Sequence, residues 1–216
     1  MISQNHVITA AHCFEGGRKQ GFTVKGYSWK RKAKATHFNP DCQFHLLNDG
    51  PNRCDVAIVE LETKEDDAPV TAVPVYNGSD EEGKTLTFFG WGVTGTADKI
   101  SKRDCNDGPE DGVFRTGQNV VAKATAPIEG GGLIEYTMRA NDDKRALPLE
   151  AICASGDSGS PAFITGDDGR EYIAATDSGS DDKNGCAYGS TDQMCRLSRH
   201  YAWIQSVIGG DASVSA

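Results

Sequence analysis

Three residues that lie far apart in the sequence could together perform nucleophilic chemistry: His12 in TAAHC, Asp55 in CDVAIVEL and Ser158 in GDSGSP. A serine hydroxyl can attack a carbonyl carbon when a base takes its proton and a carboxylate holds that base. The imidazole of histidine suits the base role because its pKa lies near neutrality. The sequence therefore predicts that Ser158 is the nucleophile, His12 the base, and Asp55 the carboxylate that orients His12.

The glycines around Ser158 fit this prediction. Gly156 and Gly159 permit a tight turn in GDSGSP, because glycine adopts backbone conformations that other residues avoid. On such a turn, the backbone N–H groups of Gly156 and Ser158 would form an oxyanion hole for the negative charge that develops on the attacked carbonyl.

The order of the three residues excludes two other hydrolase classes. The α/β-hydrolases run Ser, Asp or Glu, His around a G-x-S-x-G motif, which GDSGS does not match, and subtilisins run Asp, His, Ser. Taken singly, His12 could be a packed core histidine, Asp55 a strand cap and Ser158 part of an ordinary turn. Their joint occurrence in this order favours catalysis.

Composition and charge argue against several other classes of function. The 216 residues are 38% hydrophobic and 25% charged with a net charge of −9, which gives nucleic-acid binding little electrostatic support. The one basic cluster, at 25–34, is better explained as a solvated strand and turn. No apolar run approaches the ~20 residues that span a membrane. The acidic turns do not follow EF-hand spacing, so we expect no metal ion and no cofactor.

Seven cysteines, none in a C-x-x-C pair, favour disulfides in an oxidising compartment over a zinc site. Cys42 and Cys54 flank the loop DCQFHLLNDGPNRC and could close it locally, at the entry to the segment that carries Asp55.

Short apolar runs separated by Gly-, Asn- and Asp-rich turns predict an all-β body. Eight runs have strand length and are rich in Val, Ile, Thr or aromatic residues: 6–11, 55–61, 70–76, 85–92, 118–125, 133–140, 161–165 and 171–176. The segment 197–210 differs, because Tyr201 and Ile204 fall on one helical face, with Ser198 as a helix N-cap and Gly209 as a stop.

The motifs TAAHC, DVAIVEL, FFGWG and GDSGSP, in this order and followed by a helix with Trp203, resemble the chymotrypsin/trypsin family of serine proteases over nearly the whole chain. The resemblance implies an all-β fold of two packed antiparallel β-barrels, the first truncated at its N-terminus, with a C-terminal α-helix. Residues 1–216 would then form one peptidase domain. Its consecutive segments would be a remnant of the first barrel at 1–76, a linker at 77–84, a second barrel at 85–196 and the helix at 197–210.

The resemblance also implies that the chain as written lacks the family's usual start. In family members the freed N-terminal amino group pairs with the aspartate before the catalytic serine, which is Asp157 here. An unpaired buried carboxylate is costly. We therefore expect Asp157 to turn outward and distort the Gly156–Ser158 turn, so that this chain is poorly active and an extended version is a working protease.

Several cysteine assignments follow from the same resemblance. It implies a Cys153–Cys186 bridge beside the substrate pocket, and it leaves Cys13 without its usual partner. The two remaining cysteines, Cys105 and Cys195, are either free or paired with each other.

The substrate pocket is also assigned by resemblance. Ala151 falls at the pocket base, where trypsin-like members carry an acid, and Asp192 falls on the opposite wall. Ser178 and Gly179 belong to the edge strand that binds substrate backbone. The carboxylate of Asp192 could receive Lys or Arg, or point into a turn and leave an apolar pocket, so both preferences stay open.

The leading hypothesis is therefore a secreted, monomeric serine endopeptidase that uses an acyl-enzyme. Its expected partners are polypeptide substrates, with protein inhibitors also allowed, and neither nucleic acid nor membrane. One alternative is a non-enzymatic protease homologue that binds a partner and is inactive because of the truncation. A second alternative is an esterase or other acyl hydrolase with the same triad.

Overall fold

A computed structural model of the chain describes residues 1–17, 19–26, 29–41, 55–63, 69–97, 105, 108–125, 132–180 and 185–209. Its strands are β1 (His6–Thr9), β2 (Thr23–Lys25), β3 (Lys30–Phe38), β4 (Ala57–Leu61), β5 (Thr85–Gly90), β6 (Arg115–Val120), β7 (Lys123–Ala124), β8 (Leu133–Thr137), β9 (Pro161–Thr165), β10 (Glu171–Ser180) and β11 (Thr191–Arg196). Its helices are the 3-10 turns η1 (His12–Phe14) and η2 (Leu197–His200) and the α-helix α1 (Tyr201–Gly209).

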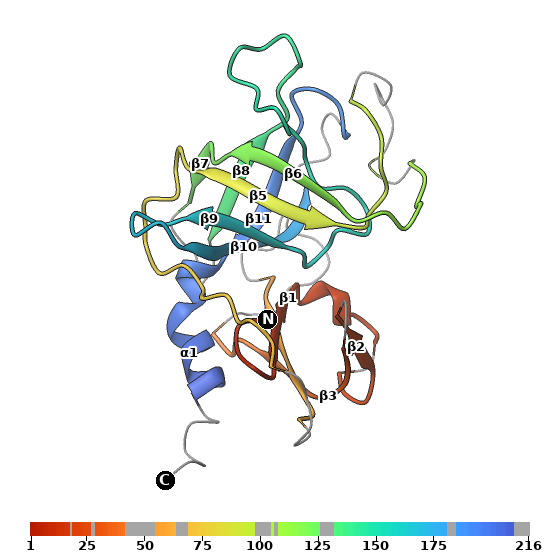
Figure 1. Cartoon of the computed structure of the whole chain (residues 1–216), viewed down its shortest axis with the longest axis vertical. Helices are drawn as coiled ribbons and strands as arrows, with labels where there is room; N and C mark the ends of the chain where they lie inside the picture. The colour runs from red at the N-terminus through yellow and green to blue at the C-terminus, as the bar shows by residue number, and fades with distance from the viewer. Residues whose placement is uncertain are drawn as a thin grey trace.

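The strands form two curled antiparallel sheets, one above the other in Figure 1. The first sheet has the order β1-β4-β3-β2, and the second has the order β6-β5-β9-β10-β11-β8-β7. With one α-helix near the C-terminus, this architecture is that of a trypsin-like double barrel and confirms the predicted fold class.

In several strands of the second sheet, buried side chains that face the core alternate with more exposed ones. In β9, PAFIT, Ala162 and Ile164 are buried and their neighbours are more exposed, as the two-residue period of a strand requires. The core that results contains Leu86, Phe88, Val121, Ile134, Tyr136, Cys153, Ala162, Ile164, Ala174, Ala175 and Met194.

The central strand of the first sheet, β4, is buried along its whole length. Ile58 packs into a cluster that includes α1, whereas Val59 and Leu61 pack into a second cluster on the other side. Because successive side chains of a strand point to opposite faces, β4 is covered on both faces and holds the residues near its start in the interior.

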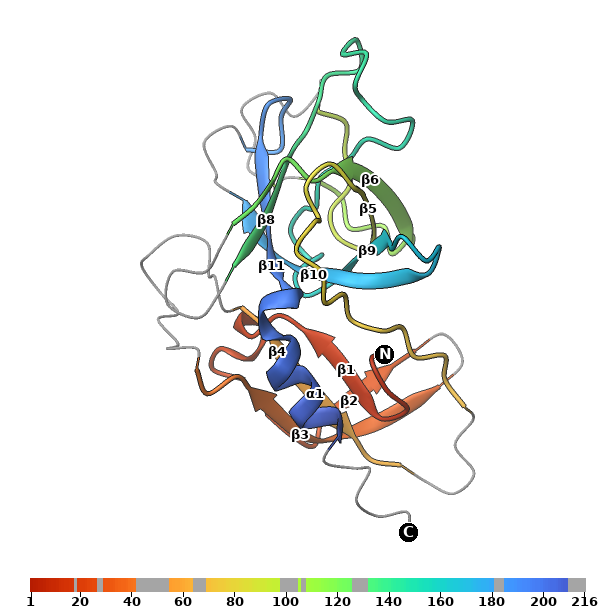
Figure 2. The same ribbon diagram turned by 90° about the vertical axis from the view of Figure 1, so that its left-hand side faces the viewer.

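Helix α1 lies along the first sheet, although it follows the last strand of the second (Figure 2). Ile204 is fully buried in a cluster with Ile58 and Ile173, which belong to different sheets. The predicted cap is wrong: Ser198 lies in η2 and its hydroxyl donates to Glu81 Oε1 at 2.8 Å. The chain enters α1 through a 3-10 turn, and the serine stabilises the buried Glu81 instead.

Several segments differ from the sequence prediction. The run 70–76 makes one bridge, Val75 to Ile173, because Pro74 has no N–H to continue a ladder. The basic cluster contributes the start of β3, and within it Arg31 is buried and donates to the Gln4 carbonyl at 2.6 Å. Strands β2 and β11 are not among the predicted runs.

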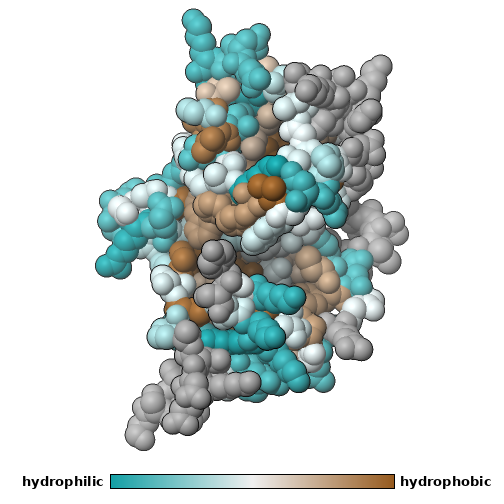
Figure 3. Space-filling view, turned by 45° about the vertical axis from the view of Figure 1, so that its right-hand side comes forward, coloured by the Kyte–Doolittle hydropathy of each residue, from teal (hydrophilic) through white to brown (hydrophobic). Residues whose placement is uncertain are grey.

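The face shown in Figure 3 carries both hydrophilic areas and hydrophobic patches. Trp91 and Phe114 are both exposed, and their ring centroids lie 4.2 Å apart. Among the described residues, no helix has the length and apolar character that a membrane crossing requires.

Candidate active site

His12 and Asp55 meet at one end of the first sheet. Strand β1 pairs with β4 so that Thr9 lies opposite Ala57, which places the residues that follow β1 beside those that precede β4. His12 begins η1, and Asp55 lies two residues before β4. The pairing of β1 with β4 thus brings together two residues that lie 43 positions apart in the sequence.

The carboxylate of Asp55 holds the histidine at two points. Asp55 Oδ2 lies 2.5 Å from His12 Nδ1, and Oδ1 accepts the backbone N–H of His12 at 2.8 Å. Asp55 is 2% exposed, whereas the His12 side chain is 29% exposed. The ring is therefore fixed through Nδ1, and the imidazole remains accessible to solvent.

The second sheet also supplies a hydrogen bond to the Asp55 carboxylate. The hydroxyl of Ser178 in β10 donates to Asp55 Oδ2 at 2.8 Å. The pKa of His12 is raised from 6.5 to about 10. The hydrogen bond to Asp55 is the largest cause and a hydrogen bond to Cys13 is the next, whereas burial lowers the pKa. The arrangement favours the imidazolium and departs from the near-neutral pKa expected of a base, so the ring has to lose a proton before it can accept one from a hydroxyl.

Ser158 lies on a turn before β9 that packs against the end of β1. Gly156 and Gly159 have φ angles of 93° and 78°, in the left-handed region that favours glycine. A Cβ on Gly159 would lie 2.2 Å from Thr9 Oγ1 and 2.8 Å from the Ala10 nitrogen. The absence of a side chain at Gly159 thus brings the Ser158 turn against the segment that leads to His12.

The hydroxyl of Ser158 is exposed and forms no hydrogen bond with any residue that the structure describes. Its carbonyl lies 3.8 Å from Cys13 Sγ, next to His12. The structure therefore brings Ser158 into the neighbourhood of the His12–Asp55 pair without a bond to the ring.

The two predicted oxyanion donors are exposed. Within the described part of the chain, the backbone N–H groups of Gly156 and Ser158 donate to no other residue, whereas those of Asp157 and Gly159 bond to Ala154 and Asp177. The turn therefore has two N–H groups available to bind an anion.

The expected outward orientation of Asp157 is wrong. Its side chain is held by two backbone amides: Oδ1 accepts the Gly92 N–H at 2.8 Å and Oδ2 accepts the Ala154 N–H at 3.1 Å. Hydrogen bonds from backbone amides stabilise a carboxylate that has no cationic partner. Asp157 thus supports the serine turn from within. A cavity of about 310 Å³ lies beside it.

The four predicted substrate-binding residues differ in their positions relative to the cavity beside Asp157. Ala151 lines the cavity beside Asp157, and of the residues described Asp192, Ser178 and Gly179 are not part of that lining. Ser178 bonds to Asp55, and Gly179 follows it at a register shift in β10.

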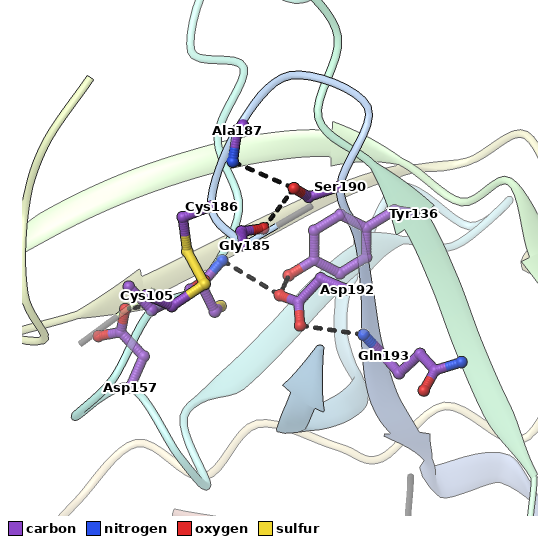
Figure 4. The surroundings of a disulfide bond; sticks show 11 residues. Cys105, Tyr136, Asp157, Gly185, Cys186, Ala187, Ser190, Asp192 and Gln193 are labelled. Atoms are coloured by element: carbon purple, nitrogen blue, oxygen red, sulfur yellow. Dashed lines mark hydrogen bonds between the residues drawn. A yellow bond between two sulfur atoms is a disulfide. The ribbon is translucent and has the colours of Figure 1, made fainter. Parts of the chain in front are cut away.

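Asp192 lies in the interior and is 1% exposed. Its carboxylate accepts the Tyr136 hydroxyl, the Cys153 N–H at 3.1 Å and the Gln193 N–H at 3.0 Å (Figure 4). Burial is the main cause that raises the pKa of Asp192 to about 7.

The predicted Cys153–Cys186 bridge is wrong, because Cys186 pairs with Cys105 (Figure 4). The thiol of Cys153 lies instead in the interior, within 4.8 Å of carboxylate oxygens of Asp177 and Asp192. The free cysteines of the described chain are Cys13, Cys153 and Cys195. Cys42 and Cys54 lie outside the described residues.

Sequence reasoning missed two members of this buried group. Asp177 and Tyr136 are nearly inaccessible, at 4% and 0% exposed. The only hint for Asp177 was a carboxylate directly after the apolar run EYIAAT, where a strand side chain is expected to be buried.

Comparison with known proteins agrees with this architecture. A family model described as a trypsin-like peptidase domain matches residues 1–170. A chymotrypsin from Phaedon cochleariae is 24% identical over 181 residues, which make up 76% of this chain and 57% of that protein. The chain thus spans little more than half the length of this relative.

Proposed function

The chain belongs to the trypsin-like peptidase family, and from this premise we propose that it is a serine endopeptidase that cleaves peptide bonds through an acyl-enzyme. The membership and the similarity to a chymotrypsin support a peptidase-type function. The observation that carries the finer assignment is the double contact of Asp55 with the ring and the backbone of His12, 2.5 and 2.8 Å long.

In the proposed mechanism, Ser158 Oγ attacks the substrate carbonyl carbon and loses its proton to Nε2 of His12. Asp55 holds Nδ1 and stabilises the imidazolium that forms. The negative carbonyl oxygen accepts hydrogen bonds from the N–H groups of Gly156 and Ser158. His12 then protonates the leaving amine, which leaves an ester between the acyl group and Ser158.

Hydrolysis of that ester completes the cycle. His12 takes a proton from a water molecule, whose oxygen attacks the acyl carbon, and the same oxyanion donors stabilise the second intermediate. Ser158 leaves with the proton that His12 returns, and the carboxylic acid product departs.

Labelling with a fluorophosphonate, read by intact mass, tests the assembled site. We expect the parent chain to gain one adduct and the Ser158→Ala variant to gain none. The matched control is Ser155→Ala, which removes an exposed hydroxyl from the same turn and should label like the parent. A folded parent that is not labelled, or labelling that survives Ser158→Ala, would overturn the proposal and favour the binding-module alternative.

Substrate choice is a further part of the proposal. Ser178 and Gly179 would bind substrate backbone, and Ala151 would line the pocket for the side chain before the cleaved bond. The buried position of Asp192 supports an apolar preference over Lys or Arg. Turnover of matched peptide amides and esters that carry Arg, Lys, Leu or Phe at this position separates these preferences, and also separates a peptidase from an esterase.

We also propose that the protein is secreted and acts as a monomer on polypeptide substrates, with protein inhibitors as further partners. The Cys105–Cys186 disulfide supports an oxidising compartment, because such bonds are rare where glutathione keeps thiols reduced.

A further inference from the structure

Three potential metal ligands meet behind the serine turn, in the interior of the second sheet. Cys153, Asp177 and Asp192 are 6%, 4% and 1% exposed. Each offers one ligand atom, and the three atoms lie within 4.8 Å of one another. They come from the segment before the Ser158 turn, from β10 and from β11, so folding alone brings them together.

The hydrogen bonds around this group are unequal. Asp192 accepts three, from the Tyr136 hydroxyl and from two backbone N–H groups. Asp177 Oδ1 is buried and has no hydrogen-bond partner among the described residues. A buried carboxylate oxygen without a partner is costly, and the side-chain hydrogen bond that the Asp177 carboxyl receives comes from Cys153, a member of the same group.

The group also has no cationic partner at short range among the described residues, and burial raises the pKa of Asp177 and of Asp192. In the described part of the chain, neither Asp177 nor Asp192 forms an ion pair within 4.0 Å. Two carboxylates buried so closely repel each other unless a proton or a cation lies between them. A cation bound by both carboxylates would remove this repulsion.

We propose that Cys153, Asp177 and Asp192 bind a Zn²⁺ ion. A thiolate together with carboxylates fits zinc, whereas Ca²⁺ and Mg²⁺ take oxygen ligands and larger ligand sets. The thiol proton of Cys153 is released to solvent as the Zn–S bond forms, so no oxidant or reductant takes part. The Tyr136 hydroxyl, which lies directly opposite on β8 and bonds to Asp192, supports that carboxylate from outside the ligand set.

An ion at this position would also affect the turn that carries Ser158. Asp177 N donates to the Ser160 carbonyl, and the Asp177 carbonyl accepts from Gly159 N, both at 2.9 Å. The next residue, Ser178, bonds to Asp55. A bound ion would therefore fix β10 against the turn that carries Ser158. The metal site itself does not rest on the proposed peptidase function.

Cobalt binding to the full, metal-free chain tests the site without any activity measurement. Co²⁺ bound by a thiolate gives a ligand-to-metal absorption band in the near ultraviolet, and titration gives the stoichiometry. We expect one Co²⁺ per chain with this band, displaced by Zn²⁺. The Cys153→Ser variant should lose the band. The Cys195→Ala variant, which removes another fully buried free thiol, should keep it.

A second variant keeps the test decisive if Cys153→Ser fails to fold. Asp177→Asn has nearly the same shape, and we expect it to weaken Co²⁺ binding by more than the roughly 10–100-fold that loss of a supporting contact costs. Zn²⁺ should raise the melting temperature of the parent and not that of Asp177→Asn. A parent without the band, a band that survives Cys153→Ser, or equal affinity in Asp177→Asn would overturn the proposal and favour a shared proton between the two carboxylates.

Discussion

At the scale of single residues, Asp55 does more than accept one hydrogen bond from His12. Oδ1 fixes the backbone where η1 begins, and Oδ2 contacts both the ring of His12 and the hydroxyl of Ser178. Because those partners come from both sheets, the carboxylate links the two halves of the site. The position of the imidazole thus depends on how the sheets pack as well as on its own loop.

The raised pKa of His12 predicts a pH dependence that belongs to this pair. The hydrogen bond to Asp55 raises the pKa from 6.5 to about 10. A group whose folded pKa is raised contributes stability below its unfolded pKa and loses that contribution as the pH rises through its folded pKa. The stabilisation from protonated His12 should therefore be complete below about pH 6.5 and vanish toward about pH 10.

Asp55→Asn tests this by removing the charge at constant size. We expect the pKa of His12 to fall toward 6.5. The difference in unfolding free energy between parent and variant should shrink as pH rises across that window. An NMR titration of His12 measures the first effect and urea unfolding the second, both in a Ser158→Ala background that prevents self-cleavage. An unchanged pKa of His12 in Asp55→Asn would contradict the prediction.

Residue types and their order predict His12, Asp55 and Ser158 as a candidate triad, and the structure places His12 and Asp55 in contact. Residue types and order could not identify the group of Cys153, Asp177 and Asp192, whose members have no local spacing that resembles a metal site. The Cys153–Cys186 prediction was wrong for a related reason: the direction in which the Cys153 thiol points is set by the packing of β10 and β11 around it.

At the scale of elements, the Ser158 turn is positioned by its contact with the end of β1. Gly159 and Gly169 offer a matched comparison, since their φ angles are 78° and 77°. A Cβ at Gly159 would collide with Thr9 and Ala10, whereas a Cβ at Gly169 would meet nothing within 4 Å. Alanine at both positions thus separates the cost of the backbone conformation from the cost of displacing the turn.

We expect Gly169→Ala to cost about 1–2 kcal/mol of stability, the usual penalty for a left-handed alanine, and to leave fluorophosphonate labelling unchanged. Gly159→Ala should cost more and slow labelling by at least about tenfold, because a small misplacement of a catalytic group reduces the rate strongly. Urea unfolding and the labelling rate measure the two effects. Equal losses in the two variants would show that the contact with β1 does not position the turn.

Strands were predictable where apolar and polar residues alternate or where an apolar run is long enough to be buried on both faces. The runs that became β1, β4, β5 and β9 are of these kinds. The sequence does not predict strand β11, TDQMCR, because its first residues are polar. Asp192 and Gln193 are nevertheless buried. The core of the second sheet, which includes Tyr136 and Cys153, determines their burial, and no local pattern reports it.

At the scale of the whole molecule, the helix that follows the second sheet completes the core of the first. The cluster around Ile204 contains Ile8, Val56 and Ile58 from the first part of the chain and Ile173 from β10. The same interface carries the bond from Ser178 to Asp55. Stability of the helix packing and geometry of the site should therefore be coupled.

Ile204→Ala tests this coupling. Ile204 is fully buried, so the change should cost about 2–5 kcal/mol. Because its neighbours belong to both sheets, amide hydrogen exchange should become faster in β4 and β10 alike, and urea unfolding should remain one transition at a lower midpoint. The matched control is Val207→Ala, on the same helix at the partly exposed edge of this cluster, where the loss should be smaller. Faster exchange confined to α1 would mean that the helix is an appendage and that the two sheets hold Ser178 and Asp55 together without it.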